Sequence, residues 1–347
     1  MPAFVSTPVV AYSTTAAWIA APAIGPADFA WLEVERANGD SRVVAGFRGD
    51  RLVVRTKGAN TTVVDQPCTT LPCGTVQAPV GNGDGSFTYA VAFPGTGGYV
   101  ATVSGAGLSN VVAEDQTDPR EITSPHPVTS AGGTVVWVDG NAILSAPAAG
   151  GTATTLVTAE QAGGTITSIA ASAAGVAWSV RPTAGGTAVA VRSPAGEIAT
   201  RATEPDTAAA TLYSVALADD GTLIAMRRSV AKGRQTIQAM AYAADGSARA
   251  LLTSVPFGKR DPFEVTRPAV TGTRVAVRLR GGPSGSRDEI WIVDLATGAS
   301  GRIAAVERRE ARLTDPAFGV GRVVWARDDV AGSRLVRARV FSAALKG

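Results

Sequence analysis

Residues 266–298 read TRPAVTGTRVAVRLRGGPSGSRDEIWIVDLATG. Two runs rich in apolar and β-branched residues, 274–279 and 289–295, are separated by a segment rich in Gly, Pro and Ser. Such runs predict paired antiparallel strands with a turn between them. The short PAV before them and ATGASGRIAAV after them supply a first and a fourth strand. The stretch therefore predicts a four-stranded antiparallel sheet.

The same pattern recurs along the chain, and clear copies lie at 126–158, 168–202, 213–253 and 315–340. The middle hairpins are spaced by roughly 35 to 55 residues, which is the range of four-stranded propeller blades. No segment shows an apolar period of 3.6 residues, so helices are not expected. The sequence predicts an all-β fold, a closed β-propeller of four-stranded antiparallel blades.

The number of blades stays open between seven and eight. Eight middle hairpins can be counted, but residues 49–82 are irregular and form either a blade or an insertion. We expect residues 1–347 to form a single propeller domain. The last repeat ends after its third strand, and we expect residues 2–6 to add the missing strand. That pairing would close the ring and cover exposed sheet edges.

The tryptophans follow the repeat. An aromatic side chain at a fixed position of each repeat is most simply explained by packing between neighbouring sheets. We expect four of them in second strands, Trp18, Trp137, Trp178 and Trp325, and two in third strands, Trp31 and Trp291.

Three phrases, RPAVTGTRVAV, DPAFGVGRVVWAR and IWIVDLATG, carry a family resemblance. They resemble the blades of TolB-like or WD40-like β-propellers of bacteria. Proteins of that kind commonly bind other proteins, glycans or envelope components. The resemblance therefore implies a recognition role for this chain.

Composition narrows the classes of partner. Apolar residues make up 45% of the chain and charged residues 18%, which favours a folded core. The net charge is +3, too small to predict a nucleic-acid partner. Residues 1–200 carry 9 Lys/Arg and 14 Asp/Glu, whereas residues 201–347 carry 23 and 15, so the positive charge lies in the second part. No apolar run is long enough for a transmembrane helix, and the first 25 residues do not read as an intact signal peptide.

Cys68 and Cys73 lie in the segment PCTTLPCG, close enough in sequence to form a disulfide across a small loop. A disulfide would favour an extracellular or periplasmic location, and two free thiols would favour the cytoplasm. A zinc site is not expected, because no further Cys or nearby His completes four ligands.

The sequence predicts no catalytic residues, metal or cofactor. His126 is the only histidine, and no GxSxG nucleophile motif is present. GNGDGS at 81–86 lacks the ligand spacing of a calcium loop, so it is interpreted as a turn, as are LADDGTL and YAADGSA.

Two groups of residues are candidates for binding. The first group precedes predicted inner strands and should surround the mouth of the propeller channel: Thr7, His126, Arg267 and Asp315. The second group is basic and lies in two loops that could contact a partner: Arg227, Arg228, Lys232, Arg234, Lys259 and Arg260.

These features predict a non-catalytic binding or scaffold protein that recognises a protein or a glycan. Two alternatives stay open. One is a propeller hydrolase or lyase acting on a glycan or peptide with paired carboxylates at the channel mouth. The other is a structural component of a surface or phage-like assembly, in which copies of the chain form an oligomer.

Overall fold

The structure is a computed structural model of the whole chain. It describes the following residues: 4–24, 29–34, 50–56, 59–66, 75–76, 79–82, 86–93, 97–104, 109–115, 128–205, 209–261, 264–319, 321–332 and 334–346.

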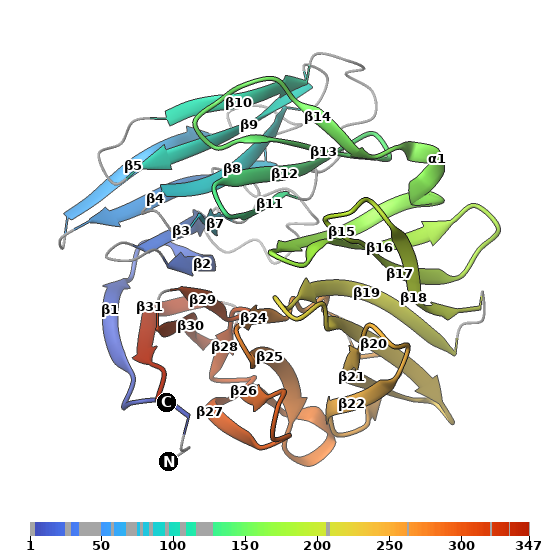
Figure 1. Cartoon of the computed structure of the whole chain (residues 1–347). Coiled ribbons are helices and arrows are strands. Elements are labelled where there is room, and N and C mark those ends of the chain that lie inside the picture. Colours follow the sequence, from blue (N-terminus) through green and yellow to red (C-terminus); the bar gives the residue numbers. More distant parts are fainter. Residues whose placement is uncertain are drawn as a thin grey trace. The chain divides into compact units, whose positions relative to one another are not determined.

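The described strands form seven antiparallel sheets (Figure 1). The chain divides into two compact units, which are treated separately. Unit 1 comprises residues 1–4, 140–144 and 155–308, and unit 2 comprises 5–139, 145–154 and 309–347. Whether they form the single predicted domain stays a prediction.

Unit 1 contains three sheets, each a meander of consecutive strands. The first has β15 (Gly164–Ser172), β16 (Gly175–Pro182), β17 (Thr187–Arg192) and β18 (Ile198–Glu204). The second has β19 (Ala210–Leu217), β20 (Leu223–Ala231), β21 (Arg234–Tyr242), β22 (Ala248–Thr253) and β23 (Phe257–Gly258). The third has β24 (Ala269–Thr271), β25 (Arg274–Gly281), β26 (Arg287–Asp294) and β27 (Ser300–Glu307).

Unit 2 contains three further sheets. One has β2 (Trp18–Ile24), β3 (Phe29–Val34), β4 (Asp50–Thr56) and β5 (Ala59–Gln66). The next has β6 (Thr75–Val76), β7 (Val80–Gly81), β8 (Ser86–Phe93), β9 (Gly97–Ser104) and β10 (Ser109–Asp115). The third has β1 (Val9–Thr14), β28 (Ala311–Leu313), β29 (Ala317–Gly319), β30 (Arg322–Ala331) and β31 (Arg334–Ala344).

The remaining sheet has β11 (Val128–Ala131), β12 (Thr134–Asp139), β13 (Ala142–Pro147) and β14 (Thr154–Val157). Two short helical segments are also described, α1 (Ala159–Ala162) and the 3₁₀ turn η1 (Pro283–Gly285). A capping box between Thr158 and Gln161 fixes the start of α1.

The two ends of the chain meet in one sheet of unit 2. The edge strand β1 pairs with β31 from Val9↔Ser342 to Thr14↔Ala338, and the two strands lie side by side in Figure 1. Within the 2–6 segment, Val5 forms an isolated bridge to Leu345. The strand that joins the first residues to the last sheet is therefore Val9–Thr14 rather than 2–6.

This pairing changes how the early repeats are divided. Because β1 belongs to the last sheet, β2 is the first strand of its own sheet. Within 49–82, β4 and β5 are the third and fourth strands of that sheet, and β6 and β7 belong to the next one. The described part of 49–82 is therefore divided between two blades, and the described strands make seven sheets rather than eight. Trp18 consequently lies in a first strand and Trp31 in a second strand, which corrects both assignments.

Neighbouring sheets within each unit bury side chains from both faces of a strand. In β20, Leu223 and Ala225 pack with residues of β16 and β17. The alternate residues Ile224 and Met226 pack with residues of β25. Successive side chains of a strand point to opposite faces, so a strand between two sheets needs apolar residues at every position.

Close packing in unit 2 predicts a strict requirement for glycine at position 319. A Cβ there would lie 2.4 Å from the main-chain oxygen of Ile24, which cannot move without disturbing β2. We expect Gly319→Ala to reduce the free energy of unfolding by roughly 1–3 kcal/mol, the usual cost of overpacking. Chemical denaturation measures the change. Arg334→Ala, at the exposed first residue of β31, is the control, and equal stability of both variants would contradict the prediction.

Candidate functional site

The basic loops predicted from the sequence meet at one end of the sheet β19–β23. β20 and β21 are joined by the two-residue turn Lys232–Gly233, and β23 pairs with the start of β21 through Arg234↔Gly258 and Gln235↔Phe257. The main-chain N–H of Lys259 donates to the oxygen of Gly233 at 3.0 Å. Two loops far apart in the predicted repeat are therefore fastened side by side.

We name the exposed cations of these two loops the basic rim: Lys232, Arg234, Lys259 and Arg260. Lys259 and Arg260 occupy a tight turn that Asp261 closes by accepting from the N–H of Gly258 at 3.0 Å. Arg234 donates to the main-chain oxygen of Pro256. In the described part of the chain, no rim residue forms an ion pair with a carboxylate. The rim is therefore a concentration of positive charge available to solvent.

Lys232 has an unusual backbone conformation. Its φ is +49°, and Gly233 follows at +72°. Positive φ at both central positions is the geometry of a type I′ hairpin turn, where Asn-Gly is preferred and a long side chain is disfavoured. The backbone of the turn is thus locally strained at Lys232, the residue that places an ammonium group at the tip. Strain of this kind is found more often at functional positions than elsewhere.

Two residues of the predicted basic group have structural partners instead. Arg227 pairs with Glu204 at 2.5 Å and donates to Gln238 at 3.0 Å, and the hydrogen bond from Glu204 raises the pKa of the guanidinium. Arg228 donates to Gln235 at 2.8 Å. Both side chains are half-buried, so the surface open to a partner is narrower than the sequence predicted.

Gln235 is the residue that holds the rim together, and the sequence analysis did not single it out. Its side chain is fully buried, and its Nε2 donates to the main-chain oxygens of Gly258 at 2.9 Å and Asp261 at 3.0 Å. With Arg228 on its Oε1, every polar atom of the amide has a partner. A buried amide satisfied in this way fixes the 258–261 turn relative to β21.

A cluster of charged side chains lies at the same end of the neighbouring sheet β24–β27. We name Glu264, Arg278, Asp288 and Arg308 the ionic cluster. Arg308 pairs with both carboxylates, and Arg278 lies 2.9 Å from Glu264 and 3.7 Å from Asp288. Asp288 is almost fully buried, and these two guanidinium groups are its ionic partners.

The protonation of the cluster is set by these pairs. Burial alone would raise the pKa of Glu264, but the charges and hydrogen bonds of Arg278 and Arg308 outweigh it and lower the pKa to about 2. Burial lowers the pKa of Arg308 less than Asp288 and Glu264 raise it, so its pKa is raised. The cavity beside the cluster has a volume of about 10 Å³. A carboxylate this acidic is a weak general base, and the cavity has no room for a substrate.

Arg280 links the cluster to the rim. Its guanidinium stacks over the buried ring of Phe257, with Cζ 4.3 Å from the ring centre, and its Nη1 lies 3.9 Å from Oδ2 of Asp261. Burial and the nearby charge of Arg308 lower the pKa of Arg280. The turn that carries Lys259 and Arg260 therefore rests on a buried aromatic ring capped by a cation.

Comparison with known proteins establishes the fold. No protein-family model matches the chain, and no curated protein matches its sequence. The β-propeller domain of the Trilobed protease from Pyrococcus furiosus matches 96% of this chain over 94% of its own length, with 9% identity and a TM-score of 0.55. The polysaccharide lyase Uly1 matches 96% of the chain over 91% of its length, with 9% identity and a TM-score of 0.55. The fold is a β-propeller.

A third similar structure is that of a Mycobacterium tuberculosis puromycin-hydrolyzing peptidase, at 15% identity and a TM-score of 0.54. That match covers 92% of this chain but only 52% of the length of the peptidase. At these identities the likeness concerns the fold alone, and a propeller hosts many unrelated functions.

The predicted channel-mouth residues do not form one described site. Thr7 precedes the edge strand β1 rather than an inner strand. Arg267 is exposed and lies two residues before β24 in unit 1, whereas Asp315 is half-buried before β29 in unit 2. His126 lies outside the described residues. A shared opening lined by these four residues stays a prediction.

Cys68 and Cys73 also lie outside the described residues, so their disulfide stays a prediction. Among the residues that are described, no three His, Cys, Asp or Glu side chains gather closely enough to hold a metal ion. No helix in that part of the chain has the length and apolar character needed to cross a membrane.

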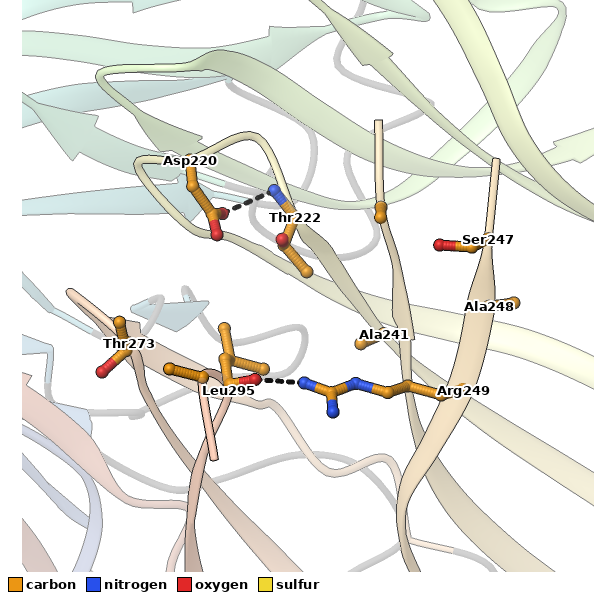
Figure 2. A pocket seen from close by; sticks show the side chains of 10 residues that line it. Asp220, Thr222, Ala241, Ser247, Ala248, Arg249, Thr273 and Leu295 are labelled. Carbon is orange, nitrogen blue, oxygen red and sulfur yellow. Dashed lines mark hydrogen bonds between the residues drawn. The ribbon is translucent and has the colours of Figure 1, made fainter. Parts of the chain in front are cut away.

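The opposite end of the two propeller blades contains a pocket that the sequence did not predict (Figure 2). Its volume is about 350 Å³. The blade β19–β23 contributes Asp220, Thr222, Ala241, Ala243, Ser247, Ala248 and Arg249, and the blade β24–β27 contributes Thr273, Leu295 and Ala296. Both blades belong to unit 1, and the lining combines small apolar side chains with one carboxylate and one guanidinium.

The acidity of Glu264 predicts a specific dependence of stability on pH. Its folded pKa of about 2 lies below the ordinary 4.5, so its contribution is complete above pH 4.5 and is lost as the pH falls towards 2. We expect Glu264→Gln to lower the free energy of unfolding at pH 7 by about 1 kcal/mol, a value reduced by solvent screening of this half-exposed side chain. Urea denaturation from pH 7 to pH 2.5 measures the difference from wild type.

That difference should shrink steadily below pH 4.5. Glu310→Gln serves as the control, because Glu310 is exposed and lies outside the cluster. A stability difference for Glu264→Gln that stayed constant down to pH 2.5 would contradict the assignment.

Proposed function

We propose that the protein is a non-catalytic binding protein that recognises an acidic segment of a protein partner at the basic rim. The observation that carries the proposal is the pairing of β23 with β21, which brings four exposed cations from two loops onto one surface. A fixed group of cations attracts an acidic partner and orients it during encounter. The resemblance to TolB-like and WD40-like propellers supports a recognition role.

The environment of the rim favours a polypeptide over a glycan. Val265, in the same loop as Lys259 and Arg260, is 56% exposed, so that loop also offers an apolar side chain to a partner. The aromatic residue described beside the rim, Phe257, is buried beneath Arg280 and unavailable for stacking on a sugar ring. An acidic peptide that also carries apolar side chains matches both features.

Catalysis finds less support in the ionic cluster. Paired carboxylates that act as acid and base need pKa values that differ and lie near the working pH. Glu264 is instead held at a pKa of about 2, and Asp288 shares Arg308 with it. These charges are balanced within the cluster and suit a supporting role beneath the rim.

The compartment and the oligomeric state belong to the proposal as well. An oxidised Cys68–Cys73 pair would support export, and two free thiols would support a cytoplasmic propeller. Intact-mass measurement before and after reduction distinguishes the two. Native mass measurement tests the alternative of a structural component that assembles with copies of itself.

Removing the charge of the rim should weaken binding without unfolding the protein. We expect simultaneous replacement of Lys232, Arg234, Lys259 and Arg260 by Gln to reduce the affinity for a labelled peptide of alternating Glu and Val at least tenfold. That loss corresponds to about 1.4 kcal/mol, within the range for several exposed charge contacts. Fluorescence anisotropy at low and high salt measures it, and wild-type affinity should fall as salt rises.

The control variant carries the same loss of charge elsewhere, with Gln at Arg309, Arg334, Arg337 and Lys346, four exposed residues of unit 2. It should bind as wild type does. Equal losses in both variants would show attraction to net charge only and would overturn the proposed surface. Stronger rim-dependent binding of a sulfated oligosaccharide would replace the peptide with a glycan.

The strained turn predicts opposite effects of one substitution. Lys232→Asn converts the turn to Asn-Gly, the preferred type I′ pair, and should raise the free energy of unfolding by about 0.5–1 kcal/mol. The same change removes the ammonium group at the tip and should weaken peptide binding severalfold. Thermal melting and the anisotropy assay measure the two effects. A variant that is less stable than wild type, or one that binds equally well, would contradict a functional origin of the strain.

A further inference from the structure

The pocket of Figure 2 lies at the turns 218–222, 243–247, 272–273 and 295–299, away from the rim at the other end of the same blades. Its volume of about 350 Å³ is at the lower end of the range for small-molecule sites, roughly 300–1,000 Å³. Alanines at 241, 243, 248 and 296 form much of the wall, and their short side chains leave the space open. The pocket is therefore large enough for a small molecule.

The two charged groups of the pocket are held in place but do not neutralise each other. Asp220 accepts a hydrogen bond from the N–H of Thr222 at 2.8 Å through Oδ1, and its second carboxylate oxygen has no described partner. Arg249 donates through Nη2 to the main-chain oxygen of Leu295 and reaches from one blade to the other (Figure 2). Neither residue forms an ion pair with any described side chain. One negative and one positive group are thus fixed around the same space.

The main chain keeps both groups in position. Leu295 donates its N–H to the oxygen of Thr273 at 2.7 Å, which fixes the acceptor of Arg249. Asp219, next to Asp220, accepts from the N–H of Ala173 at 3.2 Å and fastens the turn to the preceding blade. Groups positioned before a ligand arrives lose less conformational freedom on binding.

We propose that this pocket binds a zwitterionic dipeptide, with its carboxylate at Arg249 and its ammonium group at Asp220. Arg249 comes from β22, and Asp220 precedes β20. These strands flank β21, so their backbones lie roughly 10 Å apart. Side chains that project into the pocket shorten this span. The charged ends of an extended dipeptide are separated by roughly 6 Å, at about 3.3 Å per residue, whereas those of a single amino acid are much closer.

The rest of the lining fits the middle of such a ligand. The hydroxyl groups of Thr222, Ser247 and Thr273 can donate to, or accept from, the peptide bond of the ligand. The alanine walls favour short side chains. The site is distinct from the basic rim, which offers cations without a carboxylate that is free to bind an ammonium group.

The test uses alanyl-alanine and two blocked analogues, N-acetyl-alanyl-alanine and alanyl-alanine amide. Isothermal titration calorimetry of the whole protein should give a Kd of about 1 mM for alanyl-alanine, an affinity typical of a ligand of this size. Each blocked analogue lacks one terminal charge and should bind at least fivefold more weakly.

Two conservative variants assign the ends of the ligand. Asp220→Asn should weaken the binding of alanyl-alanine at least fivefold but leave the affinity for the acetylated analogue unchanged. Arg249→Gln should also weaken the binding of alanyl-alanine at least fivefold, but leave the affinity for the amide analogue unchanged. Glu197→Gln, at an exposed position in the 193–197 turn of the sheet β15–β18 and outside the lining, is the control and should bind as wild type does.

Three results would overturn the proposal. The first is no binding of alanyl-alanine at concentrations up to about 20 mM, twentyfold above the expected Kd. The second is equal binding of all three probes. The third is loss of binding for the amide analogue alone. Binding would then need the carboxylate but not the ammonium group, so the site would be one for simple carboxylates. Thermal melting confirms that each variant is folded, and the rim variant should bind the dipeptide unchanged.

Discussion

The burial of both faces of a strand by neighbouring sheets is the constraint from which the rest of this structure follows. In unit 2 it is evident in β4, where Leu52 and Val54 pack with residues of β8 and β9, and the intervening Val53 packs with residues of β30 and β31. A strand in this position has no face to offer a ligand. Charged and polar chemistry is consequently displaced to the strand ends, where the rim, the ionic cluster and the pocket are found.

The same constraint explains how well the fold could be predicted. Nearly continuous apolar runs separated by Gly-rich turns indicated stacked β-sheets, and the Asp-Gly turns were recognised correctly, since Asp220 and Asp245 each accept a main-chain N–H two residues on. The later repeats were divided into blades correctly, but the first ones were not, because a strand that is apolar on both faces looks the same at any place in a sheet. The partner of Val9–Thr14 lies about 330 residues away in β31, and no local pattern reveals that pairing.

The candidate site was predictable in part for related reasons. Exposed basic residues in turns can be read from the sequence, and Lys232, Lys259 and Arg260 were found in this way. Whether a cation is neutralised depends on packing between blades, however, and Arg227 of β20 meets Glu204 of β18 in a different blade. The pocket depends on the placement of alanines in two blades. It leaves no trace in the charge or spacing of a single segment.

The ionic cluster and Gln235 give the rim its rigidity at a cost in solvation. Asp288 and Gln235 are almost completely removed from water, which is costly for polar groups that lack partners. The amide of Gln235 is fully hydrogen-bonded, whereas Asp288 is held by ion pairs with Arg308 and Arg278, and its Oδ2 has no described hydrogen-bond partner. The two blades are connected here through Arg280 of β25, which caps Phe257 of β23 beneath the 258–261 turn, while Arg308 joins Glu264 to Asp288 within the cluster. Apolar residues of similar volume could replace such a cluster with little loss of stability. The directed hydrogen bonds that hold the 258–261 turn come from Gln235, and positional accuracy at the surface is what a recognition site requires.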